Sequence, residues 1–195
     1  MAKSVGKAGN ISADRISKKE LFRLIDELSN SRKEADNKIA LSLLVQYATA
    51  LRYNDLEQIS VNDILTKKSI TFIEGKTKKE RVFKLDSNNR LKKMVEKIVD
   101  NAAAIGDFDS VKFYSIQYVN RKLKQYRVQK KIVNTDGDGD FSFSTHTARK
   151  TSLYEIYANK GINASLQISQ HSSIKIHLKY ICFDDDIKEA YNCLF

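Results

Sequence analysis

The first regular pattern along the chain is a set of apolar residues three and four positions apart, at Leu21, Leu24, Ile25 and Leu28. This spacing predicts an amphipathic helix. Ser17 precedes the pattern, and Glu20 lies three positions after Ser17. This is the arrangement of a capping box. In a capping box the serine hydroxyl accepts a hydrogen bond from a free N–H group of the first helical turn. The pattern therefore predicts a helix that begins just after Ser17.

Further helices and a β-hairpin are predicted in the next part of the chain. Helical spacing covers residues 35–51, and a short helix follows over residues 54–59. Between Ser69 and Leu85 apolar residues flank a polar, basic stretch, which is typical of a β-hairpin with its turn at residues 75–78. The expected core positions in the long helix are Ile39, Leu41, Leu43, Leu44 and Ala48, and the apolar residues that indicate the hairpin are Ile70, Phe72, Ile73, Val82, Phe83 and Leu85.

The remaining chain is predicted to be mostly helical and to complete one domain. Helical spacing returns over residues 88–105 and 115–132, a polar turn follows at residues 135–140, and short helices continue toward the end of the chain. Residues 1–16 lack such a pattern and are expected to form a flexible, basic leader. The predicted domain therefore covers residues 17–195.

Composition favours a soluble globular protein. The 195 residues suffice for one hydrophobic core, and the sequence, 42% hydrophobic and 30% charged, contains no apolar run that could span a bilayer. The N-terminus lacks the apolar stretch of a signal peptide. Cys182 and Cys193 are too few for a disulfide framework, so a cytoplasmic location is expected.

The net charge of +10 favours a polyanionic partner. Each phosphate that Lys or Arg neutralises releases condensed counterions, so nucleic acid is the first candidate. An acidic membrane surface is the second, but no segment combines an apolar and a basic face strongly enough to support it. A basic run on one predicted helix either contacts phosphates or forms a solvated face, and it consists of Arg121, Lys122, Lys124, Arg127, Lys130 and Lys131.

Three segments carry the candidate chemistry: Tyr47 to Leu56, Thr145 to Thr151, and His171 to Tyr180. Together they resemble the tyrosine recombinase (phage integrase) family. The family signature is an arginine in a TGLR…(D/E)L segment, then H-x-x-R, then a histidine followed nine positions later by a nucleophilic tyrosine. A lysine in a β-hairpin turn lies between the first two motifs. The matching positions in this chain are Arg52, Asp55, Lys76, His146, Arg149, His171 and Tyr180.

The resemblance covers about residues 17–190 and implies the fold of the tyrosine recombinase catalytic domain, mainly α with a small antiparallel β-sheet (α+β). The chain departs from common family residues at four positions. Lys150 stands in place of a histidine, Ala50 of a glycine, Gln170 of a glycine or asparagine, and Lys84 of a proline. The last three departures remove no charged or nucleophilic group. The segment from Ser144 to Thr151 resembles a phage and plasmid subgroup in which lysine is usual at position 150.

The residue types suit the cleavage of a phosphodiester. Two guanidiniums, at Arg52 and Arg149, can bind the non-bridging oxygens, where negative charge grows in the transition state. His146 and His171 can donate a hydrogen bond or move a proton. Lys76 can protonate the leaving 5′-oxygen.

Tyr180 would supply the attacking oxygen and hold the 3′-phosphate covalently. Because that link conserves the bond energy, rejoining needs no ATP, and neither a cofactor nor a metal is expected. Asp55 and Lys150 are assigned supporting roles. The basic residues Lys122, Lys124, Arg127, Lys130 and Lys131 are candidate DNA contacts.

Several residues have plainer interpretations. Tyr154, Tyr157 and Tyr191 are expected to be packing residues, and His177, which matches no signature position, is expected to be structural. Three acidic residues, Asp136, Asp138 and Asp140, resemble the start of a calcium loop. The twelfth position of that loop is threonine instead of the required glutamate, so a polar turn without metal is expected.

The predicted function is site-specific DNA recombination or integration, for a phage or another mobile element, through a 3′-phosphotyrosine intermediate. The alternatives are a catalytically silent DNA-binding relative and a type IB topoisomerase. The expected partners are double-stranded DNA, further copies of the chain in a tetramer on DNA, and accessory DNA-bending proteins. Free in solution, the chain can be a monomer. Residues 184–195 are expected to form a helix that docks on a neighbouring subunit. No N-terminal core-binding domain is expected within these residues.

Overall fold

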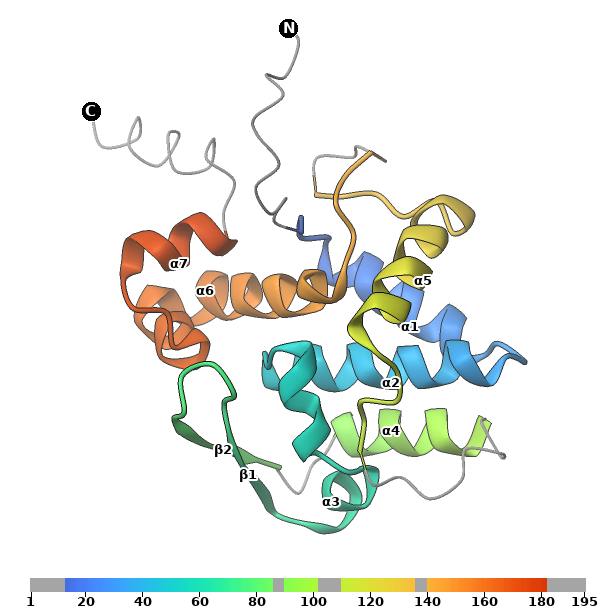
Figure 1. The fold of residues 1–195 in the computed structure, drawn as a ribbon, viewed down its shortest axis with the longest axis horizontal. Helices are drawn as coiled ribbons and strands as arrows, with labels where there is room; N and C mark the ends of the chain where they lie inside the picture. The colour runs from blue at the N-terminus through green and yellow to red at the C-terminus, as the bar shows by residue number, and fades with distance from the viewer. Residues whose placement is uncertain (1–12, 86–89, 102–109, 136–139, 182–195) are drawn as a thin grey trace, which may run out of the picture.

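A computed structural model describes residues 13–85, 90–101, 110–135 and 140–181 (Figure 1). Within these ranges the chain folds into α-helices, one short 3₁₀ helix and one antiparallel pair of strands. The predicted fold class, mainly α with a small antiparallel sheet, is confirmed. Figure 1 shows the helices grouped together, with the strand pair at one side of them, near the junction between α6 (Thr145–Ser169) and α7 (Ile174–Ile181).

Helix α1 (Lys18–Ser29) begins where the sequence predicts. The Ser17 hydroxyl accepts a hydrogen bond from the N–H group of Glu20 at 3.1 Å, and the Glu20 carboxylate accepts from Arg23. The four residues of the predicted apolar stripe are all buried. The spacing of the apolar residues therefore predicted both the helix and the face that it packs on the core.

Helix α2 (Glu34–Thr49) lies at the centre of the fold and packs against α1, α4 (Arg90–Asn101) and α6. Most of its residues are buried, because it has neighbours on several sides. The 3₁₀ helix η1 (Tyr53–Gln58) and helix α3 (Val61–Thr66) follow. The sequence analysis missed α3, although the Ser60 hydroxyl caps it by accepting from the N–H group of Asp63.

The strands β1 (Ser69–Ile73) and β2 (Glu80–Lys84) form the predicted hairpin, with Thr71 opposite Val82 in the centre of the ladder. Strand β1 alternates between exposed and buried positions, and its buried side chains are Ile70 and Phe72. The six-residue turn includes the predicted residues 75–78. Phe83 of β2 also packs against the core at partial burial, and the turn projects toward α6 and α7 (Figure 1).

The C-terminal part of the described chain contains α5 (Ile116–Gln129), α6 (Thr145–Ser169) and α7 (Ile174–Ile181). Helix α6 is interrupted at Gly161, where φ is 81° and ψ is 173°. A φ of that sign is readily adopted only by glycine. The interruption allows the last part of α6 to change direction, so that α7 packs back against α6.

The end of the predicted leader is packed on the domain. The backbone N–H group of Asp14 donates to the carbonyl of Ser142 at 2.8 Å, and Ile16 is buried, its carbonyl accepting from the Thr151 hydroxyl at 3.0 Å. Residues 13–16 therefore differ from the flexible segment that the sequence predicted. Their contacts lie more than a hundred residues away in the sequence, which local patterns do not reveal.

Candidate active site

The first element of the site is the sharp turn at the end of α2. Ala50 has a φ of 52°, in the left-handed region. Gln170 ends α6 in the same conformation, with a φ of 54°. These are two of the positions at which the chain departs from the family that it resembles, in which glycine is common at the first and glycine or asparagine at the second. The family preference has a physical reason here, because a side chain at such a φ costs roughly 1 kcal/mol.

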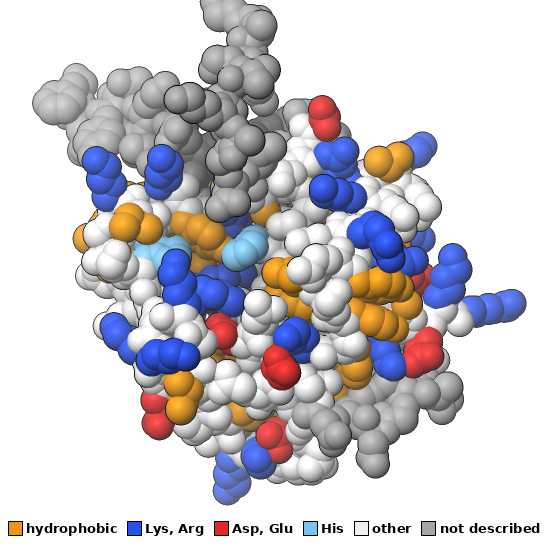
Figure 2. Space-filling view, viewed as in Figure 1, with side chains coloured by type: hydrophobic (Ala, Val, Ile, Leu, Met, Phe, Trp, Pro, Cys, Tyr) orange, Lys and Arg blue, Asp and Glu red, His pale blue; other side chains and the backbone are white. Residues whose placement is uncertain are grey.

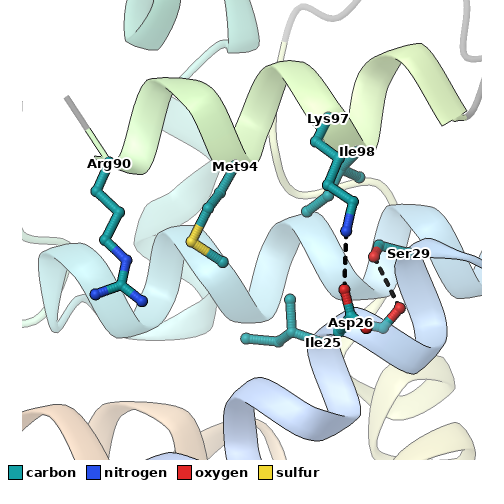
Figure 3. A pocket seen from close by; sticks show the side chains of 7 residues that line it. All are labelled: Ile25, Asp26, Ser29, Arg90, Met94, Lys97 and Ile98. Carbon is teal, nitrogen blue, oxygen red and sulfur yellow. Dashed lines mark hydrogen bonds and ion pairs between the residues drawn. The ribbon is translucent and has the colours of Figure 1, made fainter.

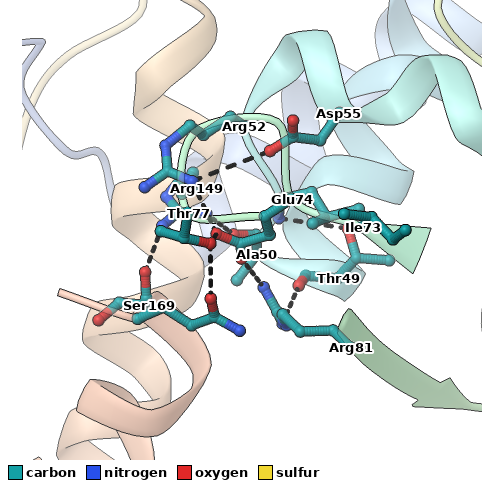
Figure 4. Close-up of polar contacts among 12 residues, drawn as sticks. Thr49, Ala50, Arg52, Asp55, Ile73, Glu74, Thr77, Arg81, Arg149 and Ser169 are labelled. Atoms are coloured by element: carbon teal, nitrogen blue, oxygen red, sulfur yellow. Dashed lines mark hydrogen bonds and ion pairs between the residues drawn. The ribbon is translucent and has the colours of Figure 1, made fainter. Parts of the chain in front are cut away.

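Arg52 leaves this turn and is held by Glu74, the residue just after β1 (Figure 4). Nη1 of Arg52 lies 2.7 Å from one carboxylate oxygen of Glu74, and Nη1 of Arg81 lies 2.8 Å from the other. The Glu74 side chain is fully buried, whereas Arg52 is 21% exposed. Burial raises the pKa of Glu74, but the hydrogen bonds from Arg81 and Arg52 outweigh it and hold the pKa below its usual value.

The hairpin turn is tied to the rest of the site from two sides. The N–H group of Gly75 donates to the Asp55 carboxylate at 3.0 Å, and a Cβ at this glycine would meet the same oxygen at 3.0 Å. The Thr77 hydroxyl donates to the side-chain carbonyl of Gln170 at 2.8 Å. Lys76 lies between these anchors and is exposed. Asp55 is thus a support for the turn that carries Lys76, and it lies 3.9 Å from Nη1 of Arg52.

The N-terminal part of α6 places Arg149 beneath the site. Its guanidinium donates to the backbone carbonyl of Ala50 and, at 2.9 Å, to the carbonyl of Ser169 (Figure 4). Arg149 is 1% exposed, and burial lowers its pKa, although the charges of Tyr180 and Glu74 act in the opposite direction. The side chain therefore joins the end of α2 to the end of α6 while bringing a buried positive charge to the site.

Tyr180, near the end of α7, meets the two signature histidines. Its hydroxyl lies 3.2 Å from Nδ1 of His146, and the ring of His171 packs edge-on against it with centroids 4.9 Å apart. Nζ of Lys150 lies 5.1 Å from the centroid of the Tyr180 ring. Lys150 is buried, and this burial lowers its pKa.

The electrostatic environment keeps the tyrosine protonated and the histidines neutral at pH 7. Burial raises the pKa of Tyr180, although the positive charges of Arg149 and Arg52 act in the opposite direction. Partial desolvation, and then the charges of Arg149, Lys150 and Arg52, lower the pKa of His146. Burial and the same two arginines lower the pKa of His171 to about 4. The phenolic proton must therefore leave Tyr180 during any nucleophilic attack.

The structure brings together all the residues that the sequence placed in the catalytic set, namely Arg52, Lys76, His146, Arg149, His171 and Tyr180, with Asp55 and Lys150 beside them. Figure 2 shows histidine side chains at the surface of this face, with Lys and Arg side chains next to them. The site is therefore open to a large anionic ligand.

Residues 14–185 match the sequence profile described as the phage integrase family. The chain belongs to this family.

Individual relatives agree with this assignment. The chain is 28% identical, over 145 residues, to the probable integrase/recombinase YoeC of Bacillus subtilis, a match that covers 73% of this chain and 76% of that protein. A λ integrase dimer bound to a COC′ core site has a similar fold, with a TM-score of 0.64 at 14% identity, and the match covers 92% of this chain and 51% of that one.

Two further solved structures share the fold. The catalytic domain of bacteriophage HP1 integrase matches with a TM-score of 0.55 at 20% identity, over 86% of each chain. XerH recombinase in a post-cleavage complex with a difH substrate matches with a TM-score of 0.61 at 14% identity, over 97% of this chain and 56% of that one. The chain spans about half the length of the λ integrase and XerH chains.

The candidate DNA-contact residues lie on or just after α5, and they differ in how far other residues of the chain hold them. Arg127 is held by the carbonyl of Phe141 and by Asp140 at 3.3 Å, and Nζ of Lys130 lies 3.4 Å from Glu27. Lys124 and Lys131 are exposed, and Nζ of Lys122 lies 5.9 Å from the centroid of the Tyr118 ring.

Sequence reasoning missed Glu74, Arg81 and His177 as parts of the site. The ion pairs of Glu74 join residues of different elements, and no family motif was matched to it. Arg81 lies in the hairpin segment that resembles the family, but only Lys76 of that segment was given a role. Tyr154 and Tyr157 pack beside Tyr180 and Leu153, as expected for packing residues. Residues 136 and 138 of the predicted polar turn lie outside the described residues. So do residues 184–195, which include Tyr191 and the predicted C-terminal docking helix.

A separate pocket of about 240 Å³ lies between α1 and α4 and shares no residue with the site (Figure 3). Lys97 and Asp26 form an ion pair across it at 2.9 Å.

Among the described residues, no helix is long and apolar enough to cross a membrane. The same part of the chain contains no group of three or more His, Cys, Asp or Glu side chains placed to hold a metal ion.

Proposed function

We propose that this chain cleaves and rejoins DNA strands in site-specific recombination. The observation that carries the proposal is the position of the Tyr180 hydroxyl, 3.2 Å from Nδ1 of His146 and within the field of Arg149 and Arg52. A nucleophile beside a neutral base and two guanidiniums suits attack on a phosphodiester. The Tyr180 oxygen would bond to phosphorus, and the bond to the 5′-oxygen would break.

Each residue of the site has a distinct role in this reaction. His146 accepts the phenolic proton, because its neutral Nδ1 lies within hydrogen-bond distance of the Tyr180 hydroxyl. Arg52 and Arg149 stabilise the negative charge that grows on the non-bridging oxygens. Lys76, on the projecting hairpin turn, delivers the proton that the departing 5′-oxygen takes up. Rejoining reverses these steps with a new 5′-hydroxyl, and the phosphotyrosine bond supplies the energy.

The partners follow from this reaction. We propose double-stranded DNA as the substrate, in the cytoplasm, and several copies of the chain on each recombination site. The solved relatives include a λ integrase tetramer bound to a Holliday junction, which supports assembly on DNA. Accessory DNA-bending proteins are a further expectation that the same family likeness suggests.

Substitution of Tyr180 by Phe is expected to abolish the covalent protein–DNA complex, because it removes the attacking oxygen alone. The assay uses nicked suicide DNA from the junction of the chain's own element, without added metal, and a denaturing gel. The matched control is Tyr157→Phe, a partly buried tyrosine of the same packing cluster. Equal amounts of complex in both variants would refute the assignment, and relaxation of any supercoiled plasmid without a specific site would favour a topoisomerase.

The candidate DNA-contact residues on or just after α5 are expected to contribute to DNA affinity through phosphates, without distinguishing one base sequence from another. Lys124→Ala should weaken binding uniformly across DNA sequences and reduce the slope of log K against log salt by roughly 1. Arg127→Ala should instead lower the thermal stability, because Arg127 is engaged by Phe141 and Asp140. Fluorescence anisotropy over a salt series measures the slope, and an unchanged slope for Lys124→Ala would remove this helix from the interface.

A further inference from the structure

His177 is a buried histidine of α7 that has no part in the proposed reaction. Its side chain is fully buried. Its Nδ1 lies 3.0 Å from Nδ1 of His171, and its Nε2 lies 2.8 Å from the Ser165 hydroxyl. That hydroxyl lies in turn 2.7 Å from the carbonyl oxygen of Leu153. A continuous hydrogen-bonded chain thus runs from the backbone of α6 to the imidazole of His171.

The direction of this chain is set by its backbone end. A carbonyl only accepts hydrogen bonds, so the single hydrogen of the Ser165 hydroxyl is donated to Leu153. The hydroxyl oxygen then accepts from His177, which must carry its hydrogen on Nε2. The serine therefore selects one of the two tautomers of the neutral His177 ring, the one with its hydrogen on Nε2.

The tautomer of His177 determines the tautomer of His171. Burial is the largest cause that lowers the pKa of both rings to about 4, so both are neutral at pH 7. A neutral imidazole carries one N–H group, and that of His177 is used on Ser165. Its Nδ1 is therefore a lone pair, and the hydrogen between the two rings belongs to Nδ1 of His171.

We propose that His177 is a positioning residue, which holds His171 in the Nδ1–H form so that Nε2 presents a lone pair to the reacting groups. The inference rests on the proposed function, because it concerns the same strand-cleavage site. Nε2 is the ring nitrogen that does not face His177. In this form Nε2 of His171 can accept a hydrogen bond from a reacting group, while His146 keeps the role of accepting the phenolic proton. A free imidazole in water favours the opposite form, with its hydrogen on Nε2, so the arrangement depends on a partner.

The direct test is the state of each ring nitrogen in the free protein. The chain has three histidines, so a ¹⁵N-labelled sample gives a spectrum that can be assigned with single-histidine variants. Two-bond ¹H–¹⁵N correlation at pH 7.5 is expected to show Nδ1–H for His171 and Nε2–H for His177. The reverse assignment, or Nε2–H at both rings, overturns the proposal.

The His177→Leu variant tests the consequence for the reaction. It removes the acceptor for His171, so His171 is expected to become a mixture of both forms, and covalent complex formation is expected to slow about tenfold, as when outer partners of a site are lost. The affinity for DNA should stay the same. An unchanged rate in this variant overturns the positioning role.

A second variant covers the case in which His177→Leu does not fold. Ser165→Ala keeps both imidazoles but removes the acceptor of the His177 N–H group, and both rings are expected to become mixtures. Unchanged nitrogen signals would overturn the proposal. Because these spectra are recorded without DNA, a wild-type protein that forms no covalent complex would refute the proposed function alone, and the nitrogen signals would still decide the state of His171.

Discussion

Replacement of Arg149 by Lys is expected to reduce the rate of covalent complex formation by about 100- to 1000-fold, the usual cost of removing a transition-state donor. The guanidinium is a planar fork that reaches two carbonyls, those of Ala50 and Ser169, while its remaining N–H groups can serve the phosphate. A single ammonium group cannot span these acceptors. Positive charge is retained in the variant, so a loss of rate would show that geometry matters as well as charge.

The same variant is expected to be less stable, by about 1–3 kcal/mol, because at least one buried carbonyl loses its donor. Single-turnover cleavage of suicide DNA at saturating protein gives the rate, and thermal unfolding gives the stability. Arg121→Lys, at an exposed position of α5, is the matched control. Cleavage at the wild-type rate in Arg149→Lys would show that the transition state does not use this guanidinium.

Replacement of Glu74 by Gln is expected to lower the free energy of unfolding by about 3 kcal/mol, the lower end of the cost of breaking a buried ion pair. The amide has nearly the size of the carboxylate, so the effect reports the lost charge rather than a cavity. Two guanidiniums, those of Arg52 and Arg81, lose their shared counter-ion. We expect the lower end of this cost because the Arg52 and Arg81 side chains are 21% and 14% exposed, so water still solvates part of their charge when the counter-ion is lost.

The substitution should also slow strand cleavage by about tenfold, since Arg52 loses the partner that orients it. Chemical denaturation measures the stability, and the suicide-substrate assay measures the rate. Glu80→Gln removes the same charge from an exposed position of β2 and serves as the control. If both variants unfold at the same denaturant concentration, the Glu74 ion pairs are not a source of stability.

Most of the fold could be predicted from local patterns. The periodicity of Leu21, Leu24, Ile25 and Leu28 predicted the position and the buried face of α1, and the change of pattern after Ser69 predicted the hairpin. Helix α3 was missed because six residues are too few to establish a helical period. The docking of residues 13–16 was missed because it depends on Ser142 and Thr151, far along the chain.

The candidate catalytic residues could also be predicted from the sequence, because their types, order and separations match a family signature. The sequence therefore determined which side chains belong together: the two arginines, the two histidines, the hairpin lysine and Tyr180. Only the tertiary structure decided how they are held. It places Glu74 against Arg52, Ala50 and Ser169 against Arg149, and the His177–Ser165 chain behind His171. Most of these contacts join separate elements, and the one between Arg149 and Ser169 joins the two ends of α6 across its interruption. Their partners depend on packing in three dimensions and leave no period in the sequence.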